Sequence, residues 1–277
     1  MVVRFVSVLL VVIIAGCVGS SAPEESREDY NESAAGEESF IDDHPAYNEP
    51  DWKEQASEMV YWEFDRETSE WKPAGTPPDC PEIIMKTPVD IDLATSVLYP
   101  GQERTGGYKP HGGFRFDGSD NNIEVRAPFD GYVFRGSRSL VGDEIQYSLD
   151  VVHPCGIMYR FGHMLELAPK WERVANEFRE PTEGDTRTTN VEPVEVKTGE
   201  LMATKVGLTN NVFVDWGVYD VRKKNEASQD SEWAALRGGE HASYALCWFE
   251  LLPPEDEQKI RALPPADGTS GTQSDYC

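Results

Sequence analysis

Hydrophobic and polar positions divide the chain into three parts. Nine of the ten residues from Phe5 to Ile14 are apolar, whereas residues 18–51 are rich in Ser, Gly, Pro and acidic side chains. Apolar residues become frequent again only from Trp52. A segment with so few apolar residues cannot bury enough surface to fold on its own. We therefore expect a disordered stretch before Trp52 and ordered structure beyond it.

The first part of the ordered region, residues 52–98, is predicted to contain a β-hairpin. Aromatic and polar residues mix in the segments 61–64 (YWEF) and 70–72 (EWK), which flank a short polar turn. Two such segments joined by a short polar loop are typical of antiparallel strands. A proline-rich passage follows, and we expect it to lead into the core.

Residues 99–222 are predicted to form the main core, built of β-strands. Runs of aromatic and β-branched residues alternate there with glycines, a pattern typical of strands joined by tight turns. One helix is predicted at 169–178, where four apolar residues share a face at helical spacing, namely Trp171, Val174, Ala175 and Phe178. This helix is expected to begin a helical insertion that spans residues 169–198.

The remaining residues, 223–277, are predicted to form a tail that packs on the core. They contain a second short predicted helix at 255–263 and end in Tyr276-Cys277. The predicted fold class is therefore mainly β, with one or two short helices.

Charge excludes one class of partner. Asp and Glu number 50 against 25 for Lys and Arg, so the formal net charge is -25. A protein of this charge repels the phosphates of nucleic acids. We expect no nucleic-acid partner, and we expect most of the acidic residues to form a solvated surface.

The start of the chain resembles the signal peptide of prokaryotic lipoproteins. Arg4 precedes the apolar run, and Ala15-Gly16-Cys17 follows it. About 20 apolar residues are needed to span a bilayer, so a segment of ten is typical of an export signal rather than a permanent membrane helix. Position, length, charge and small residues all favour this interpretation over a buried strand.

The lipobox resemblance implies that residues 1–16 are removed and that Cys17 receives a lipid. Residues 17–51 would then be a lipidated cysteine and an acidic linker, extended by repulsion between its charges. The protein is expected to be exported and anchored to a membrane by this lipid, facing the periplasm or the cell exterior. The membrane would thus be one partner.

Four further cysteines would lie in a compartment that permits disulfides. Cys80, Cys155, Cys247 and Cys277 allow three pairings, and the sequence does not choose among them. No CxxC pair is present, so a cysteine-rich zinc module is not expected.

Four sequence blocks follow one another between residues 99 and 219. They are HGGF at 111–114, IEVRAPFDGYV at 123–133, the histidine pair His153 and His163, and a segment at 199–218 that ends in FVDWGV. In order and spacing these blocks resemble the lysostaphin or LytM-type zinc endopeptidases, which cut peptide cross-links in bacterial cell walls. The resemblance covers under half of the chain. It implies a barrel-sandwich hybrid, or duplicated hybrid motif, with Gly131 in a hairpin turn and the site in a groove.

The residues that the family uses for chemistry are largely replaced. Its three zinc ligands, His, Asp and His, fall on His111, Arg115 and Asp215, so only the first is kept. A histidine that helps to activate the bound water falls on His163 and is kept. A second helper histidine falls on Phe213 and is lost.

These replacements leave two interpretations of the site. In the first, Arg115 and Asp215 form an ion pair in place of the metal, because a guanidinium cation repels a dication and pairs with a carboxylate. In the second, the alignment shifts by two residues, Asp117 replaces Arg115 as a ligand beside His111 and Asp215, and His163 is the catalytic base. We favour the first.

Other candidate residues are given structural roles. His153 is expected to make a structural hydrogen bond, and His44 and His241 lie in polar stretches where solvation is expected. The tryptophans are expected in the core rather than on a glycan-binding surface.

Three functions are consistent with this pattern. The favoured one is a non-catalytic surface module, without a cofactor, that binds a cell-envelope polymer or an envelope protein. The alternative is an active zinc endopeptidase, or cell-wall hydrolase, with a variant ligand set. In the third, the lipoprotein is purely structural, and the insertion and the C-terminal tail cover the groove.

Overall fold

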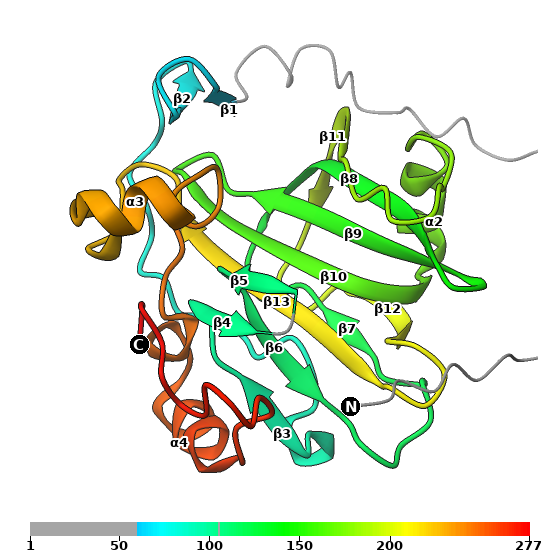
Figure 1. The fold of residues 1–277 in the computed structure, drawn as a ribbon. Coiled ribbons are helices and arrows are strands. Elements are labelled where there is room, and N and C mark those ends of the chain that lie inside the picture. Colours follow the sequence, from blue (N-terminus) through cyan, green and yellow to red (C-terminus); the bar gives the residue numbers. More distant parts are fainter. Residues whose placement is uncertain (1–59, 105) are drawn as a thin grey trace, which may run out of the picture. The chain divides into compact units, whose positions relative to one another are not determined.

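A computed structural model describes residues 60–104 and 106–277 (Figure 1). These residues are mainly β, with a large antiparallel sheet and short helices, which confirms the predicted fold class. The predicted signal peptide, Cys17, the acidic linker and His44 lie outside the described residues. Within them, each helix is too short or too polar to cross a membrane.

The main sheet has nine strands, all paired antiparallel. Seven of them lie side by side in the order β11 (Thr189–Val196), β8 (Gly131–Val141), β9 (Glu144–Val152), β10 (Ile157–Leu167), β13 (Phe213–Asp220), β6 (Gly112–Arg115) and β3 (Ser96–Leu98). The other two are β12 (Leu201–Val206), which pairs with β10, and β7 (Val125–Arg126), which pairs with β12.

Strand β10 changes its partner part-way along one edge. Its first half, Ile157–Gly162, pairs with β13, whereas Met164–Leu167 pairs with β12. The pairing with β9 on the other edge is also irregular between Phe161 and Met164. Residue 163 therefore lies where the sheet divides, and a β-bulge at such a point redirects the side chain.

Gly113 allows β6 and β13 to approach closely. A Cβ atom at this position would lie 2.2 Å from the backbone oxygen of Val214 on β13, closer than any real contact. Gly113 is also opposite Asp215 in the pairing of the two strands. The glycine thus places the backbone of β6 against the residue that becomes the centre of the site.

The predicted hairpin is confirmed as β1 (Tyr61–Asp65) paired with β2 (Glu70–Ala74). Its two tryptophans, Trp62 and Trp71, are buried in a small apolar cluster that also contains Met158 and Tyr219 of the main sheet. A second small hairpin pairs β4 (Gln102–Arg104) with β5 (Gly107–Lys109).

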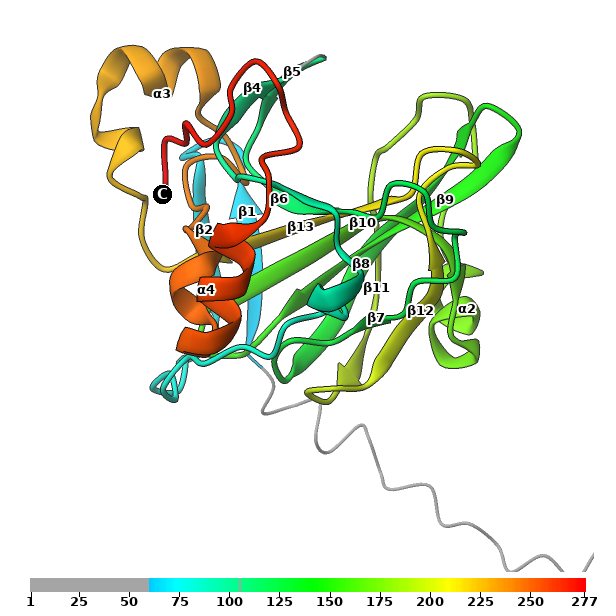
Figure 2. The same ribbon diagram turned by 90° about the horizontal axis from the view of Figure 1, so that it is seen from below.

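Short helices lie at the two ends of the long strands (Figures 1 and 2). α2 (Pro169–Ala175) and α4 (Pro254–Ala262) confirm the two predicted helices, whereas α3 (Ser231–Arg237) was not expected. Single 3-10 turns complete the structure: η1 (Ile91–Leu93), η2 (Ala227–Gln229) and η3 (Trp248–Leu251). The segment 169–198, predicted to be a helical insertion, is helical only at its start and ends in β11, a strand of the main sheet.

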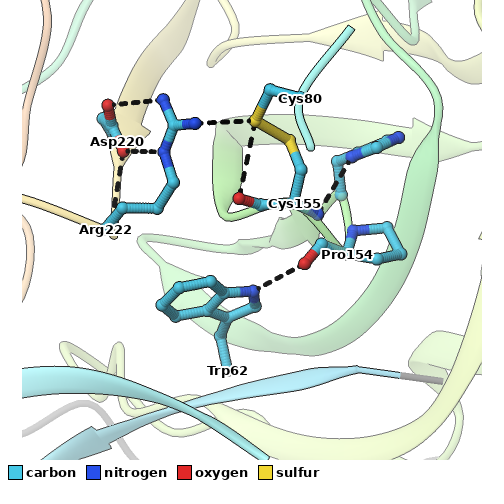
Figure 3. Close-up of a disulfide and its surroundings, with 7 residues drawn as sticks. Trp62, Cys80, Pro154, Cys155, Asp220 and Arg222 are labelled. Carbon is cyan, nitrogen blue, oxygen red and sulfur yellow. Dashed lines mark hydrogen bonds and ion pairs between the residues drawn. A yellow bond between two sulfur atoms is a disulfide. The ribbon is translucent and has the colours of Figure 1, made fainter. Parts of the chain in front are cut away.

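Two disulfides join segments far apart in the sequence. Cys80 pairs with Cys155, and Cys247 pairs with Cys277. The first attaches the proline-rich lead-in to the turn between β9 and β10, beside the Trp62 indole, which donates to the Pro154 carbonyl at 3.0 Å (Figure 3). The second attaches the end of the chain to the segment before η3.

We expect the first disulfide to stabilise the fold by restricting the unfolded chain. It spans 75 residues, and a loop of that length corresponds to about 4 kcal/mol in the chain-entropy model. Urea unfolding of the variant with Cys80→Ser and Cys155→Ser should show a loss of this size. The matched variant with Cys247→Ser and Cys277→Ser, whose loop spans 30 residues, should lose slightly less. Unchanged stability in the first variant would contradict this account.

Candidate functional site

A pocket of about 350 Å³ lies over one face of the main sheet. Strands β8, β9, β10 and β13 form its floor, and the segment from Tyr108 to His111 forms part of its wall. Most of the side chains that line it carry polar atoms, including Lys109, His111, Ser139, Gln146, Ser148, Arg160, His163, Asp215, Tyr219 and His241. The pocket is therefore suited to a ligand that forms hydrogen bonds.

The centre of the pocket is a carboxylate shared by two histidines. Oδ2 of Asp215 lies 3.0 Å from Nε2 of His111 and 3.2 Å from Nε2 of His163. His111 immediately precedes β6, whereas His163 lies on β10 and Asp215 on β13. Their grouping, which the resemblance implied, is thus present, although Asp215 stands where the family has a histidine.

The backbone and a neighbouring ring position His163. Its φ of 61° is left-handed, an uncommon conformation for a non-glycine residue and one that is favoured at functional sites. Its carbonyl accepts from the N–H of Gly207 at 2.7 Å, where β10 passes from β13 to β12. The Phe213 ring, 4.3 Å away between centroids, packs against the imidazole. Phe213 therefore restricts the orientation of the His163 ring.

Gln146 determines which nitrogen of His163 carries a proton. The amide nitrogen of Gln146 donates to the Gly207 carbonyl at 2.7 Å, so its oxygen faces Nδ1 of His163 at 2.5 Å. Nδ1 must then be the donor. Nε2, which faces Asp215, either carries a second proton as an imidazolium or presents its lone pair to a cation.

The two imidazoles stabilise the ionised form of Asp215. Burial alone would raise the pKa of this carboxyl group, whose side chain is 17% exposed, but His111 and His163 hold the pKa well below its usual value. Asp215 is therefore a carboxylate at neutral pH.

Arg115 does not pair with Asp215, which corrects the favoured prediction. Arg115 lies opposite Phe213 on β13 rather than opposite Asp215. Its guanidinium donates to Asp117 and to the side-chain oxygen of Asn211, both at 2.8 Å. Asp117 lies only two residues away, in the turn after β6, so it is an easier partner than a carboxylate across the sheet.

Asp117 is likewise not part of the cluster. Its side chain is 56% exposed and is held by Arg115, which lowers its pKa through their hydrogen bond. The variant ligand set His111, Asp117 and Asp215 is therefore not assembled. Within residues 60–104 and 106–277, no group of three or more His, Cys, Asp or Glu residues has the geometry of a metal site.

The other two structural assignments have different outcomes. Nδ1 of His153 accepts from the Cys155 N–H at 3.1 Å, so a structural hydrogen bond is confirmed. Gly131, expected in a hairpin turn, is instead the first residue of β8. A Cβ atom there would lie 2.9 Å from the Val152 oxygen on β9, so this glycine allows two strands to approach.

A second polar cluster, beside the first, was not predicted. Asp150 on β9 is completely buried, and its Oδ2 accepts from Nε of Arg135 at 2.6 Å. Arg135 also bonds Glu240 and lies 3.2 Å from Nε2 of His241. Burial alone would raise the pKa of Asp150, but Arg160 and Arg135 hold it far below its usual value. His241, expected to be solvated, lines the pocket, and burial lowers its pKa.

The Asp150 cluster corresponds to a recognisable pattern in the sequence. Polar residues recur at every second position in β8 and β9, as Arg135, Ser137 and Ser139 and as Gln146, Ser148 and Asp150. Alternate residues of a strand share one face, and all six are buried. A polar face on two adjacent strands is usually a solvated one, so the sequence alone does not distinguish a surface from the floor of a pocket.

Comparison with known proteins adds no family to these observations. No protein-family model matches the chain, and no curated protein matches it. The resemblance to the lysostaphin-type peptidases therefore stays a prediction that rests on the sequence blocks.

We expect Asp215→Asn to remove a contribution to stability that depends on pH. A carboxylate with a lowered pKa stabilises the fold above the pKa of the unfolded chain, about 3.9, and this stabilisation is lost as the pH falls through the folded pKa. The variant should lose about 1–3 kcal/mol at neutral pH, because two partly buried imidazoles lose their charged acceptor. The difference from wild type should shrink below about pH 4, as measured by urea unfolding.

Asp117→Asn is the matched control for this experiment. Its carboxylate is more than half exposed and pairs with one arginine, so the loss should stay below about 1 kcal/mol. Equal losses in the two variants would contradict a special role for Asp215.

Proposed function

We propose that this chain is an exported, lipid-anchored surface protein whose pocket binds a polar component of the cell envelope without hydrolysing it. The component is either an envelope polymer or an envelope protein. The signal-like leader and Cys17 support the export and the anchor. The volume and the polar lining of the pocket support binding.

The residues of the Asp215 cluster are the main support for binding without hydrolysis. A catalytic zinc ion requires three protein ligands, an open position and a group that activates water. The cluster offers His111, His163 and Asp215 only, since Arg115 holds Asp117 outside it. If all three bind a metal, no base is left in the cluster, and if His163 is the base, two ligands are left.

The pocket also argues against a purely structural lipoprotein. In that case the insertion and the tail would fill the groove over the sheet. A cavity of about 350 Å³ remains there, although Thr186 of the insertion and His241 of the tail reach its lining.

Zinc binding remains the second candidate, because one observation favours it. The Gln146 oxygen faces Nδ1 of His163 and leaves Nε2 directed at Asp215. A hydrogen bond from the other ring nitrogen is typical of metal-binding histidines. His111, His163 and Asp215 would hold a zinc ion here only after their side chains rearrange, because as they stand the three do not have the geometry of a metal site. The ion would supply Lewis-acid chemistry.

A zinc titration distinguishes the two candidates. We expect the melting temperature of the purified full chain to respond to zinc no more than that of the variant with His111→Ala and His163→Ala. A specific site at 100 times its Kd would add about 2.7 kcal/mol of stability and a shift of several degrees. A shift seen only in wild type, reversed by a chelator and accompanied by hydrolysis of cell-wall peptides, would establish the hydrolase instead.

We expect Cys17→Ser to release the protein from the membrane. The lipid on this cysteine would supply most of the membrane affinity, and the acidic chain, at -25, would contribute none. Fractionation of cells that express the variant should recover it in the soluble exported fraction, whereas Cys247→Ser should stay with the membrane. Detergent-dependent recovery of Cys17→Ser would contradict the anchor.

A further inference from the structure

One arginine that lines the pocket has unused donors. Arg160 on β10 lines the pocket, and its side chain is 22% exposed. Nη1 lies 3.5 Å from Oδ1 of Asp150, and Nη2 donates to the Ser148 hydroxyl at 3.3 Å. Charge-assisted hydrogen bonds are normally 2.7–2.9 Å long, and a guanidinium has five N–H donors. Arg160 is therefore held in place by weak contacts and retains donors for a ligand.

Tyr219 supplies a buried hydroxyl on the same face of the sheet. Arg160 pairs across the strands with Gly217, and a Cβ atom at Gly217 would lie 2.2 Å from the Tyr219 hydroxyl oxygen. The hydroxyl is thus directly over Gly217, next to Arg160. Tyr219 is fully buried and lines the pocket, yet its hydroxyl has no hydrogen-bond partner among residues 60–104 and 106–277. A buried donor without an acceptor destabilises a fold.

The charges around this position favour an anion. Asp150 is shared between Arg160 and Arg135, so it does not fully neutralise Arg160. Lys109 lines the same pocket, and in the described part of the chain no carboxylate lies within 4.0 Å of its amine. Two cations thus line one pocket of a protein whose net charge is -25.

We propose that Arg160 and Tyr219 form a subsite for the carboxylate group of the ligand. The guanidinium would donate to the carboxylate, and the Tyr219 hydroxyl would donate to one of its oxygens, which supplies the missing acceptor. A carboxylate fits better than a phosphate, which carries a charge of about -1.5 to -2. Asp150 lies beside Arg160 and Asp215 lines the same pocket, so a doubly charged anion would be repelled more strongly. The subsite rests on the proposed function, since it names the chemistry of the ligand that the pocket binds.

A pair of probes that differ only in charge tests the subsite. N-acetylglycine and N-acetylglycinamide share every group except the carboxylate, which is an amide in the second. We expect isothermal titration calorimetry of the purified full chain, with EDTA present, to show binding of the acid at least tenfold tighter than binding of the amide. EDTA removes any contribution of a metal at the Asp215 cluster.

Tyr219→Phe tests whether the Tyr219 hydroxyl binds the ligand or stabilises the fold. The variant removes the hydroxyl and keeps the ring, so the affinity for the acid should fall roughly fivefold, the effect of one hydrogen bond. The melting temperature should stay unchanged or rise, because a donor without a partner is removed. Arg160→Lys keeps the positive charge but loses the planar fork of donors. It should lower the affinity for N-acetylglycine about tenfold.

Tyr244→Phe is the matched control. The Tyr244 hydroxyl donates to the Ser69 carbonyl at 3.2 Å, away from the pocket lining. This variant should lower the melting temperature and leave the affinity for the acid unchanged.

Three results would overturn the subsite. The first is equal binding of the acid and the amide, or binding of neither. The second is a Tyr219→Phe variant that melts earlier with unchanged affinity, which would assign the hydroxyl to the fold. The third is acid binding that requires zinc and is lost in His111→Ala. Zinc-dependent hydrolysis, which would refute the proposed function, is measured separately and does not affect the titrations in EDTA.

Discussion

The site depends on the point at which β10 exchanges β13 for β12. Because both strands use the same edge of β10, one after the other, the chain between them must turn beside residue 163. The Gly207 N–H bonds the His163 carbonyl there, and the side-chain amide of Gln146 bonds the Gly207 carbonyl. The backbone that divides the sheet thus also orients the imidazole toward Asp215. A change in this turn would disturb the strand pairing and the site together.

The sequence predicted the parts of the fold that local periodicity determines. The aromatic hairpin and the helices α2 and α4 follow from apolar spacing within a few residues. β11 was missed because Pro193 and four polar residues interrupt its pattern, yet it lies at the edge of the sheet, where a proline is tolerated. α3 buries Trp233 alone, so it has no apolar face to detect, although Asp230 caps its first turn.

The sequence predicted which residues meet in the candidate site, but not all of the contacts that they make. The resemblance of the sequence blocks implied that His111, His163 and Asp215 lie together, and the structure groups all three. The predicted partner of Arg115 was wrong, because the observed register places Arg115 opposite Phe213 and its guanidinium reaches Asp117 and Asn211 instead. The Asp150 cluster was missed because buried and solvated polar faces have the same period of two.

Apolar packing on the opposite face of β13 and β6 holds the polar residues of the site in place. On β13, Asp215 lies between Val214 and Trp216, which point to the opposite face and are completely buried. Trp216 packs on Phe114 of β6, with ring centroids 6.3 Å apart, and on Trp248, at 4.4 Å. Close packing of this kind leaves the backbone little freedom. The position of the Asp215 carboxylate is therefore fixed by this packing, so the ligand that we propose would bind with little reorganisation of β13.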